Sequence, residues 1–235
     1  MTVLTAFAYG IYTFGPPVAL FFVTVARHPH EIITMILGAF FWLLALLFAS
    51  LVWIIVIPLK DTPAFTLPIS VILQEVFRWL YFKLLKKADH LLEIVSEDKS
   101  DLRKHKIAYV GGLGFGLIAG IVMFANVLSV ASGPGTVRSN QYFVTVSAFS
   151  TQVMIILHIC WGVIFFAGLE SKNWLYIFAV PISHMFISCL SLLINLANTP
   201  AYFLSFGYFL CVVFVALAFF AAGARPKTLV DFFKR

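Results

Sequence analysis

The stretch IAYVGGLGFGLIAGIVMFANVLSV, residues 107–130, decides the fold of this chain. It contains 24 consecutive residues without a charged side chain. A helix of about 20 apolar residues is long enough to cross the hydrocarbon core of a bilayer. The stretch also lacks the alternation of apolar and polar residues that marks a strand of a membrane barrel. It therefore predicts a membrane-spanning helix.

Comparable apolar runs lie on both sides of this stretch. Together the runs cover residues 3–26, 32–57, 64–85, 107–130, 142–167, 174–196 and 202–222. The whole chain is 62% hydrophobic and 11% charged, whereas soluble domains are about half apolar and about one quarter charged. The sequence therefore predicts an all-α polytopic membrane protein, a single membrane domain over residues 1–235 built as a seven-transmembrane-helix bundle.

The basic residues predict the orientation of the bundle. On the side of the N-terminus lie Lys60 and Arg138. The other side holds every remaining Lys and Arg except Arg78, namely Arg27, Lys83, Lys86, Lys87, Lys99, Arg103, Lys104, Lys106, Lys172, Arg225, Lys227, Lys234 and Arg235. By the positive-inside rule, the N-terminus is lumenal or extracellular and the C-terminus is cytosolic. The basic excess is then an orientation signal, and nucleic acid is not expected as a partner.

The first apolar run is expected to stay in the mature protein. A cleaved signal peptide begins with a basic segment, and the first basic residue here is Arg27, on the far side of the run.

One strongly polar segment, KKADHLLEIVSEDKSDLRKHK at residues 86–106, separates the third and fourth runs. Its first half places Ala88, Leu91, Leu92 and Val95 at helical spacing, so we expect the third helix to continue out of the membrane. Because charges of both signs mix here, a solvated cytosolic loop is favoured over a specific lipid site.

Three glycines in the fourth run lie four residues apart: Gly112, Gly116 and Gly120. We call them the glycine stripe. Glycines at this spacing form one smooth helix face on which another backbone can approach closely. No strand precedes them, so a dinucleotide-binding loop is excluded. The stripe predicts helix packing, and its partner is either another helix of this chain or another protein.

A second set consists of polar residues inside the predicted spans. Glu75 and Arg78 are three residues apart, which predicts a local ion pair. His158 and His184 lie near the middle of their runs and are expected to meet in the bundle core, either as neutral imidazoles joining helices or as a functional site. The predicted intramembrane polar core is Gln74, Glu75, Arg78, Asn126, His158 and His184, with Asn195 in the last turn of the sixth run.

Several enzyme classes lack their residues in this sequence. Every aspartate is predicted to lie in a loop or a tail, which excludes an intramembrane aspartyl protease; these are Asp61, Asp89, Asp98, Asp101 and Asp231. His30 and Glu31 are followed by Thr34 where a zinc protease needs a second histidine. No metal site, cofactor or disulfide framework is predicted, since the three cysteines lie inside apolar runs. A remaining possibility is a glutamic-type intramembrane protease using Glu75 and the two histidines, although it lacks a second carboxylate.

Motifs along nearly the whole chain resemble the anterior-pharynx-defective subunit family of gamma-secretase. Besides the glycine stripe, they are FGPPVALF at 14–21, AFFWL at 39–43, QEVFR at 74–78, LLKKA at 84–88, SGPGT at 132–136, LH at 157–158, WGVIFF at 161–166 and SH at 183–184. The family's glycine motif corresponds to the glycine stripe, and its two membrane histidines correspond to His158 and His184.

The resemblance implies a non-catalytic scaffold with seven spans and a lumenal N-terminus. It implies nicastrin, presenilin and the presenilin enhancer as partners within membrane lipid, in a complex that cleaves type I membrane proteins such as Notch and amyloid precursor protein. The implied compartments are the endoplasmic reticulum, Golgi, plasma membrane and endosomes.

Two other functions stay open from the sequence. The family resembles the CAAX-prenyl endopeptidases through Glu75, His158 and His184, so a CAAX-protease-like endopeptidase is the alternative. Their paired glutamates correspond to Gln74 and Glu75 here, which removes one carboxylate and argues against hydrolysis. A small transporter is a third possibility, but the chain has no pair of broken helices and little charge inside its spans.

Overall fold

The computed structural model describes residues 3–56, 62–93, 101–132, 143–197 and 200–224. Within these ranges every regular element is a helix, as predicted, and there is no strand. The elements are α1 (Val3–Leu20), the π-helix η1 (Phe21–Val25), α2 (Pro29–Ile55), α3 (Pro63–Glu93), α4 (Asp101–Ser132), α5 (Phe143–Ser171), α6 (Trp174–Ala197) and α7 (Pro200–Ala221).

Six of the seven α-helices in the described ranges are long and apolar enough to cross a membrane, α1 together with η1. The exception is α3, which is long enough at 31 residues but carries Gln74, Glu75 and Arg78 in its apolar part. These three side chains lower its hydropathy. The same residues that attract attention as a site therefore weaken the membrane signal of their helix.

The predicted loop 86–106 is largely helical at both ends. α3 continues to Glu93 and α4 already begins at Asp101, while residues 94–100 lie outside the described part. The expectation that Asp89 and Asp101 lie in a loop is therefore wrong, because each belongs to a helix. The physical reason is that the segment contains neither Gly nor Pro and consists mostly of helix-forming residues.

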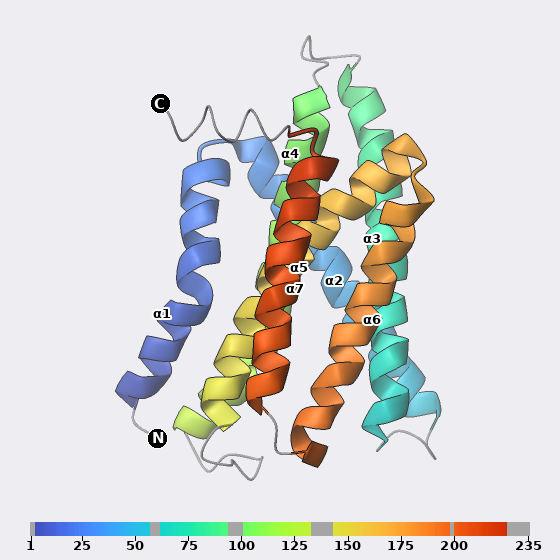
Figure 1. Cartoon of the computed structure of the whole chain (residues 1–235). Coiled ribbons are helices and arrows are strands. Elements are labelled where there is room, and N and C mark those ends of the chain that lie inside the picture. Colours follow the sequence, from blue (N-terminus) through green and yellow to red (C-terminus); the bar gives the residue numbers. More distant parts are fainter. Residues whose placement is uncertain (1–2, 57–61, 94–100, 133–142, 198–199, 225–235) are drawn as a thin grey trace.

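The helices lie side by side and form one bundle, in which α1 begins at one end and α7 finishes at the opposite end (Figure 1). Helices α4 and α5 form its core: 61% and 72% of their spans are buried, against 17–22% for the other four candidate spans. The outer helices instead expose large apolar side chains such as Phe22, Ile54 and Phe209. Such an outer surface is suited to lipid, where exposed apolar groups carry no penalty.

Helix α1 contains Pro16 and Pro17 within its length, and the π-helix η1 follows it directly. A proline has no N–H, so Pro16 leaves the carbonyl of Tyr12 without its helical donor. The side chain of Gln152 on α5 supplies the missing donor, with Nε2 2.9 Å from the Tyr12 carbonyl oxygen. A contact between helices thus satisfies a backbone group that water cannot reach in a bilayer.

Candidate functional site: a buried polar network

The glycine stripe packs against α5 of the same chain. A Cβ placed on Gly116 would lie 2.7 Å from the carbonyl oxygen of Ile155, and one on Gly112 would lie 2.9 Å from that of Ile159. At Gly120 the nearest atom is the side-chain Cδ1 of Ile155, at 2.5 Å. Contacts under 3.0 Å with backbone leave no room for a side chain, so α4 and α5 approach at a distance that glycine permits.

A second glycine surface on α4 faces α2, and the sequence reasoning missed it. A Cβ on Gly38 would lie 2.6 Å from the carbonyl oxygen of Gly111, and one on Gly114 would overlap the carbonyl oxygen of Met35. The signal was present in the sequence, because Gly111 and Gly114 lie beside the stripe in the same run. α4 is therefore approached closely on two faces.

Four of the predicted polar residues meet in the centre of the bundle: Glu75 and Arg78 from α3, His158 from α5 and His184 from α6. We call these four residues the buried network. Arg78, His158 and His184 are each 1% exposed and Glu75 is 8% exposed. Charges at this depth require partners, since an unpaired ion in a low-dielectric interior is costly.

The predicted ion pair between Glu75 and Arg78 is present and bidentate. Arg78 donates from Nε to Glu75 Oε2 at 3.1 Å and from Nη2 to Oε1 at 3.2 Å. Oε1 also lies 2.7 Å from Nδ1 of His184. Both carboxylate oxygens of Glu75 therefore already accept charge-assisted hydrogen bonds.

Arg78 also reaches α5. Its Nη2 donates to Nδ1 of His158 at 3.0 Å, and Nη1 donates to the His158 carbonyl oxygen at 3.4 Å. The guanidinium carbon lies 4.8 Å from the ring centroid of Phe115 and 5.9 Å from that of Trp161. The cation is thus bonded in its plane and covered by aromatic faces, which desolvated cations favour.

The two histidine rings lie 5.1 Å apart between centroids in an edge-to-face arrangement, as their similar depth predicted. The rings of Trp161 and His184 lie 4.4 Å apart between centroids, with their planes tilted by 31°. Sequence reasoning missed Trp161 and Phe115, because an aromatic residue within an apolar run carries no local signal of its partner.

Gln74, another predicted core residue, bonds outside the buried network. Gln74 accepts a hydrogen bond from Trp42 Nε1 at 2.9 Å, which joins α3 to α2. Asn126 belongs to α4, but its side chain lies outside the described residues, as does that of Asn195.

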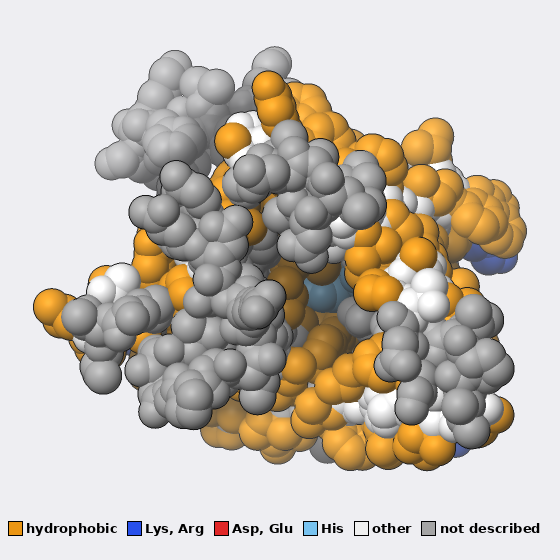
Figure 2. Space-filling model, turned by 90° about the horizontal axis from the view of Figure 1, so that it is seen from below, with side chains coloured by type: hydrophobic (Ala, Val, Ile, Leu, Met, Phe, Trp, Pro, Cys, Tyr) orange, Lys and Arg blue, Asp and Glu red, His pale blue; other side chains and the backbone are white. Residues whose placement is uncertain are grey.

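A cavity of about 230 Å³ reaches the histidines from the end of the bundle where α1 begins. Figure 2 shows the bundle from that end, with a histidine side chain at the floor of a central hollow. Its lining includes His158, His184, Gln74, Ser150 and Ser188. The two histidines of the buried network therefore face a mainly apolar cavity that contains a few polar side chains.

A second polar cluster, absent from the sequence predictions, joins α1, α5 and α7. Tyr208 donates to Gln152 Oε1 at 2.8 Å, and the hydroxyl groups of Tyr208 and Tyr12 lie 2.8 Å apart. Gln152 is an amide inside an apolar run. The criterion that selected Gln74 would also have found it.

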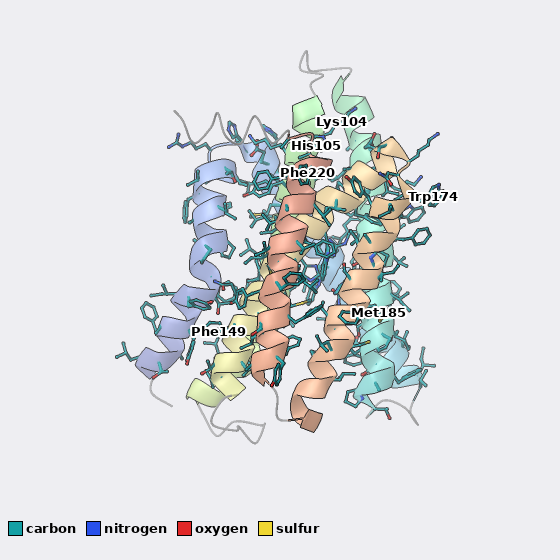
Figure 3. All side chains as sticks on the ribbon, in the orientation of Figure 1. Lys104, His105, Phe149, Trp174, Met185 and Phe220 are labelled. Carbon is teal, nitrogen blue, oxygen red and sulfur yellow. The ribbon has the colours of Figure 1, made fainter. Side chains whose placement is uncertain are left out.

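The opposite end of the bundle carries charged pairs. Lys86 on α3 lies 3.2 Å from Glu170 on α5, and Lys106 on α4 lies 2.5 Å from Glu31 on α2. A cavity of about 580 Å³ opens here, and Lys104, His105 and Phe220 line it at that end of the bundle (Figure 3).

The chemistry available at the buried network is binding and positioning. Glu75 holds two charged or polar donors on its oxygens, so it is poorly arranged to take a proton from water. Among the described residues, no group of three or more His, Cys, Asp or Glu side chains is arranged to hold a metal ion.

The chain is similar to the members of one protein family. The family model described as Aph-1 protein matches residues 4–225. The chain is 43% identical to "Gamma-secretase subunit Aph-1b" of Danio rerio over 81% of this chain and 79% of that protein. It is 39% identical to "Gamma-secretase subunit APH-1B" of Homo sapiens over 97% and 93%, and 39% identical to "Gamma-secretase subunit Aph-1" of Drosophila melanogaster over 99% and 98%.

Proposed function

The chain belongs to the Aph-1 family, and we propose that it is a non-catalytic scaffold subunit of the gamma-secretase intramembrane protease complex. The observation that carries this proposal is the buried network. Glu75 and Arg78 pair on α3 and also bond to His184 on α6 and His158 on α5, and both oxygens of Glu75 are engaged. Such a network fixes the relative positions of helices and leaves the Glu75 carboxylate no free oxygen with which to take a proton.

The proposed partners are nicastrin, presenilin and the presenilin enhancer. The first two are the subunits that the scaffold assembles and stabilises, and presenilin supplies the catalytic aspartates. Substrates are then chosen by other chains of the complex, and they are type I membrane proteins such as Notch and amyloid precursor protein. We further infer residence in the endoplasmic reticulum, Golgi, plasma membrane and endosomes.

The proposed topology has seven crossings, a lumenal or extracellular N-terminus and a cytosolic C-terminus. α1 begins and α7 finishes at opposite ends of the bundle (Figure 1), which supports an odd number of crossings with α3 included. Lys86, Lys104 and Lys106 belong to the end where α3 finishes and α4 begins. Cytosolic placement of that end follows the positive-inside rule.

The proposed scaffold holds its shape through packing between its own helices. A substitution that disturbs this packing should therefore weaken the binding of partner subunits. Replacing Gly116 by Leu forces a side chain into backbone of α5 that would lie 2.7 Å from its Cβ. We expect separation of α4 from α5 and a several-fold loss of nicastrin and presenilin that co-purify with the tagged chain. Membrane insertion should be unchanged, because the new residue is apolar.

The matched control is Gly15→Leu. A Cβ on Gly15 meets no heavy atom within 4 Å, so this variant should co-purify both subunits at the level of the unmodified chain. Full co-purification with a normally expressed Gly116→Leu chain would contradict the packing role. Equal losses in both variants would mean that any leucine in a span interferes.

One observation keeps a second function in view. A carboxylate that orients an imidazole, as Glu75 does with His184 at 2.7 Å, is also part of many hydrolytic sites. A CAAX-protease-like endopeptidase predicts that the chain purified alone cleaves prenylated or helical substrates and loses this activity on Glu75→Gln. No turnover across a broad substrate set would remove this alternative.

A further inference from the structure

His158 presents a hydrogen-bond donor on the nitrogen that Arg78 does not use. A guanidinium has only donors, so Nδ1 of His158, 3.0 Å from Arg78 Nη2, must accept with a lone pair. In a neutral imidazole the proton then sits on Nε2. A proton on Nδ1 as well would point one N–H at another.

His184 presents the opposite group. Its Nδ1 lies 2.7 Å from Glu75 Oε1, and a carboxylate only accepts, so Nδ1 carries the proton. The charges of Glu75 and Arg78 already balance, so a third charge at this depth would have no counter-ion. The ring is therefore neutral, and its Nε2 carries a lone pair.

Both rings line the 230 Å³ cavity, and a further polar group without a partner belongs to its lining. Ser150 lines the same cavity, and its Oγ is buried without a hydrogen-bond partner among the described residues. A buried hydroxyl without a partner is costly. The cavity is larger than the about 30 Å³ that one water molecule occupies in the liquid, and Figure 2 shows the hollow leading to it.

We propose that this cavity is a binding site for an uncharged ligand that enters it with a hydroxyl group. The hydroxyl oxygen accepts from Nε2 of His158 and the hydroxyl proton is donated to Nε2 of His184. The ring centroids lie 5.1 Å apart, and the proposal requires one oxygen to lie within hydrogen-bond distance of both Nε2 atoms.

The pair of opposite tautomers selects against charged ligands. A divalent cation needs lone pairs from both rings and finds one, while a carboxylate needs two donors and also finds one. A hydroxyl group, which donates and accepts, matches both nitrogens. Water and the alcohol group of a lipid share this chemistry. The site is set by Glu75 and Arg78 and exists whichever complex the chain joins.

The test uses the full chain, labelled with 15N-histidine and purified in mild detergent with its associated subunits. Nitrogen NMR should show two buried neutral rings, one protonated on Nε2 and one on Nδ1. The Nε2 proton of His158 should exchange magnetisation with water or with a lipid hydroxyl. If the source is water, the signal survives complete delipidation. If the source is a lipid, delipidation removes it and mass spectrometry of the extract identifies the alcohol.

Two variants separate the cavity site from the buried network. An asparagine side chain can take over the bond that a histidine makes through Nδ1 while lacking Nε2. His158→Asn should therefore abolish the hydroxyl signal while His184 keeps its Nδ1 proton. His184→Asn should leave His158 in its tautomer and weaken the exchange several-fold. Ser150→Ala removes only the unpartnered hydroxyl and should shift the resonances of both rings. This variant replaces the asparagine variants in the test if either of them does not fold.

Several results would overturn the proposal. They are identical tautomers in the two rings, a doubly protonated ring at neutral pH, or no hydroxyl signal in protein with and without lipid. Zinc ion or acetate added in excess should leave both rings unchanged, and a shift of both rings at stoichiometric zinc would show that the site takes cations instead.

Discussion

Arg78 shows at the scale of one residue how a cation is held in the middle of an apolar bundle. Glu75 neutralises it, His158 accepts from it, and the rings of Phe115 and Trp161 cover it. Arginine suits this place better than lysine, because its planar group bonds in the plane and stacks on its faces.

Removing either partner of this pair should leave the other as a buried charge without its counter-ion. Glu75→Gln leaves Arg78 charged and without its counter-ion, and Arg78→Met leaves Glu75 in the same condition. Each single change should cost about 3–5 kcal/mol, whereas the double variant should lose less than the sum of the two. Thermal and denaturant unfolding of the purified chain in one detergent measures this, and additive losses would contradict a coupled pair.

The residues of the buried network could be predicted only in part. Spacing along one helix predicted the contact of Glu75 with Arg78, and similar depth in two runs predicted that His158 and His184 meet. The bonds from α3 to α5 and α6 could not be predicted, because helix order is set by packing between distant segments. Phe115 and Trp161 could not be selected from the sequence for a different reason. The chain has twenty-six phenylalanines and five tryptophans, and nothing in the sequence shows which of them contacts a cation.

At the scale of elements, α1 shows how side-chain bonds hold a helix that is little buried. Its span is only 17% buried, and Pro16 removes part of its own backbone bonding. Gln152 supplies the missing donor to the Tyr12 carbonyl, and the hydroxyl groups of Tyr208 and Tyr12 add a link from α1 to α7. A loosely packed helix is thereby fixed in register against α5.

Loss of the Gln152 side-chain amide should increase local opening in α1 alone. Gln152→Leu leaves the Tyr12 carbonyl without a donor, at a cost of about 1–3 kcal/mol for a buried unpaired group. Hydrogen exchange should rise in α1 and stay unchanged in α4. Tyr208→Phe should give a smaller rise, and Tyr202→Phe on the same helix, 77% exposed, none. A rise spread evenly over all helices would show that the cluster supports the whole bundle instead.

The ends of helices could be predicted from the sequence where Gly or Pro marks them. Where neither residue occurs, the prediction was too short. α2 begins at Pro29, a proline in the first turn, close to the predicted run. α3 and α4 extend beyond their runs because nothing in residues 86–106 stops a helix. Hydrophobicity predicts the part of a helix that lies in lipid, and the helix continues as long as its residues favour it.

At the scale of the whole molecule, the proposed orientation can be tested with two cysteines. Thr62 precedes α3 at one end of the bundle, and His30 lies in the first turn of α2 at the other. Both are exposed. With the three native cysteines replaced, Thr62→Cys should react with an impermeant thiol reagent outside intact cells. His30→Cys should react only after permeabilisation, and the reverse pattern would overturn the orientation.

The central position of α5 also has a consequence for biogenesis. Ribosomes make α1 to α4 first, and the glycine stripe on α4 packs against Ile155 and Ile159, which are not yet synthesised. Until α5 is inserted, the glycine face of α4 is therefore exposed to lipid. Arg78 on α3 also lacks its hydrogen bond to His158 during this time. Assembly of this bundle has to pass through a half-made stage in which its most polar groups are the least protected.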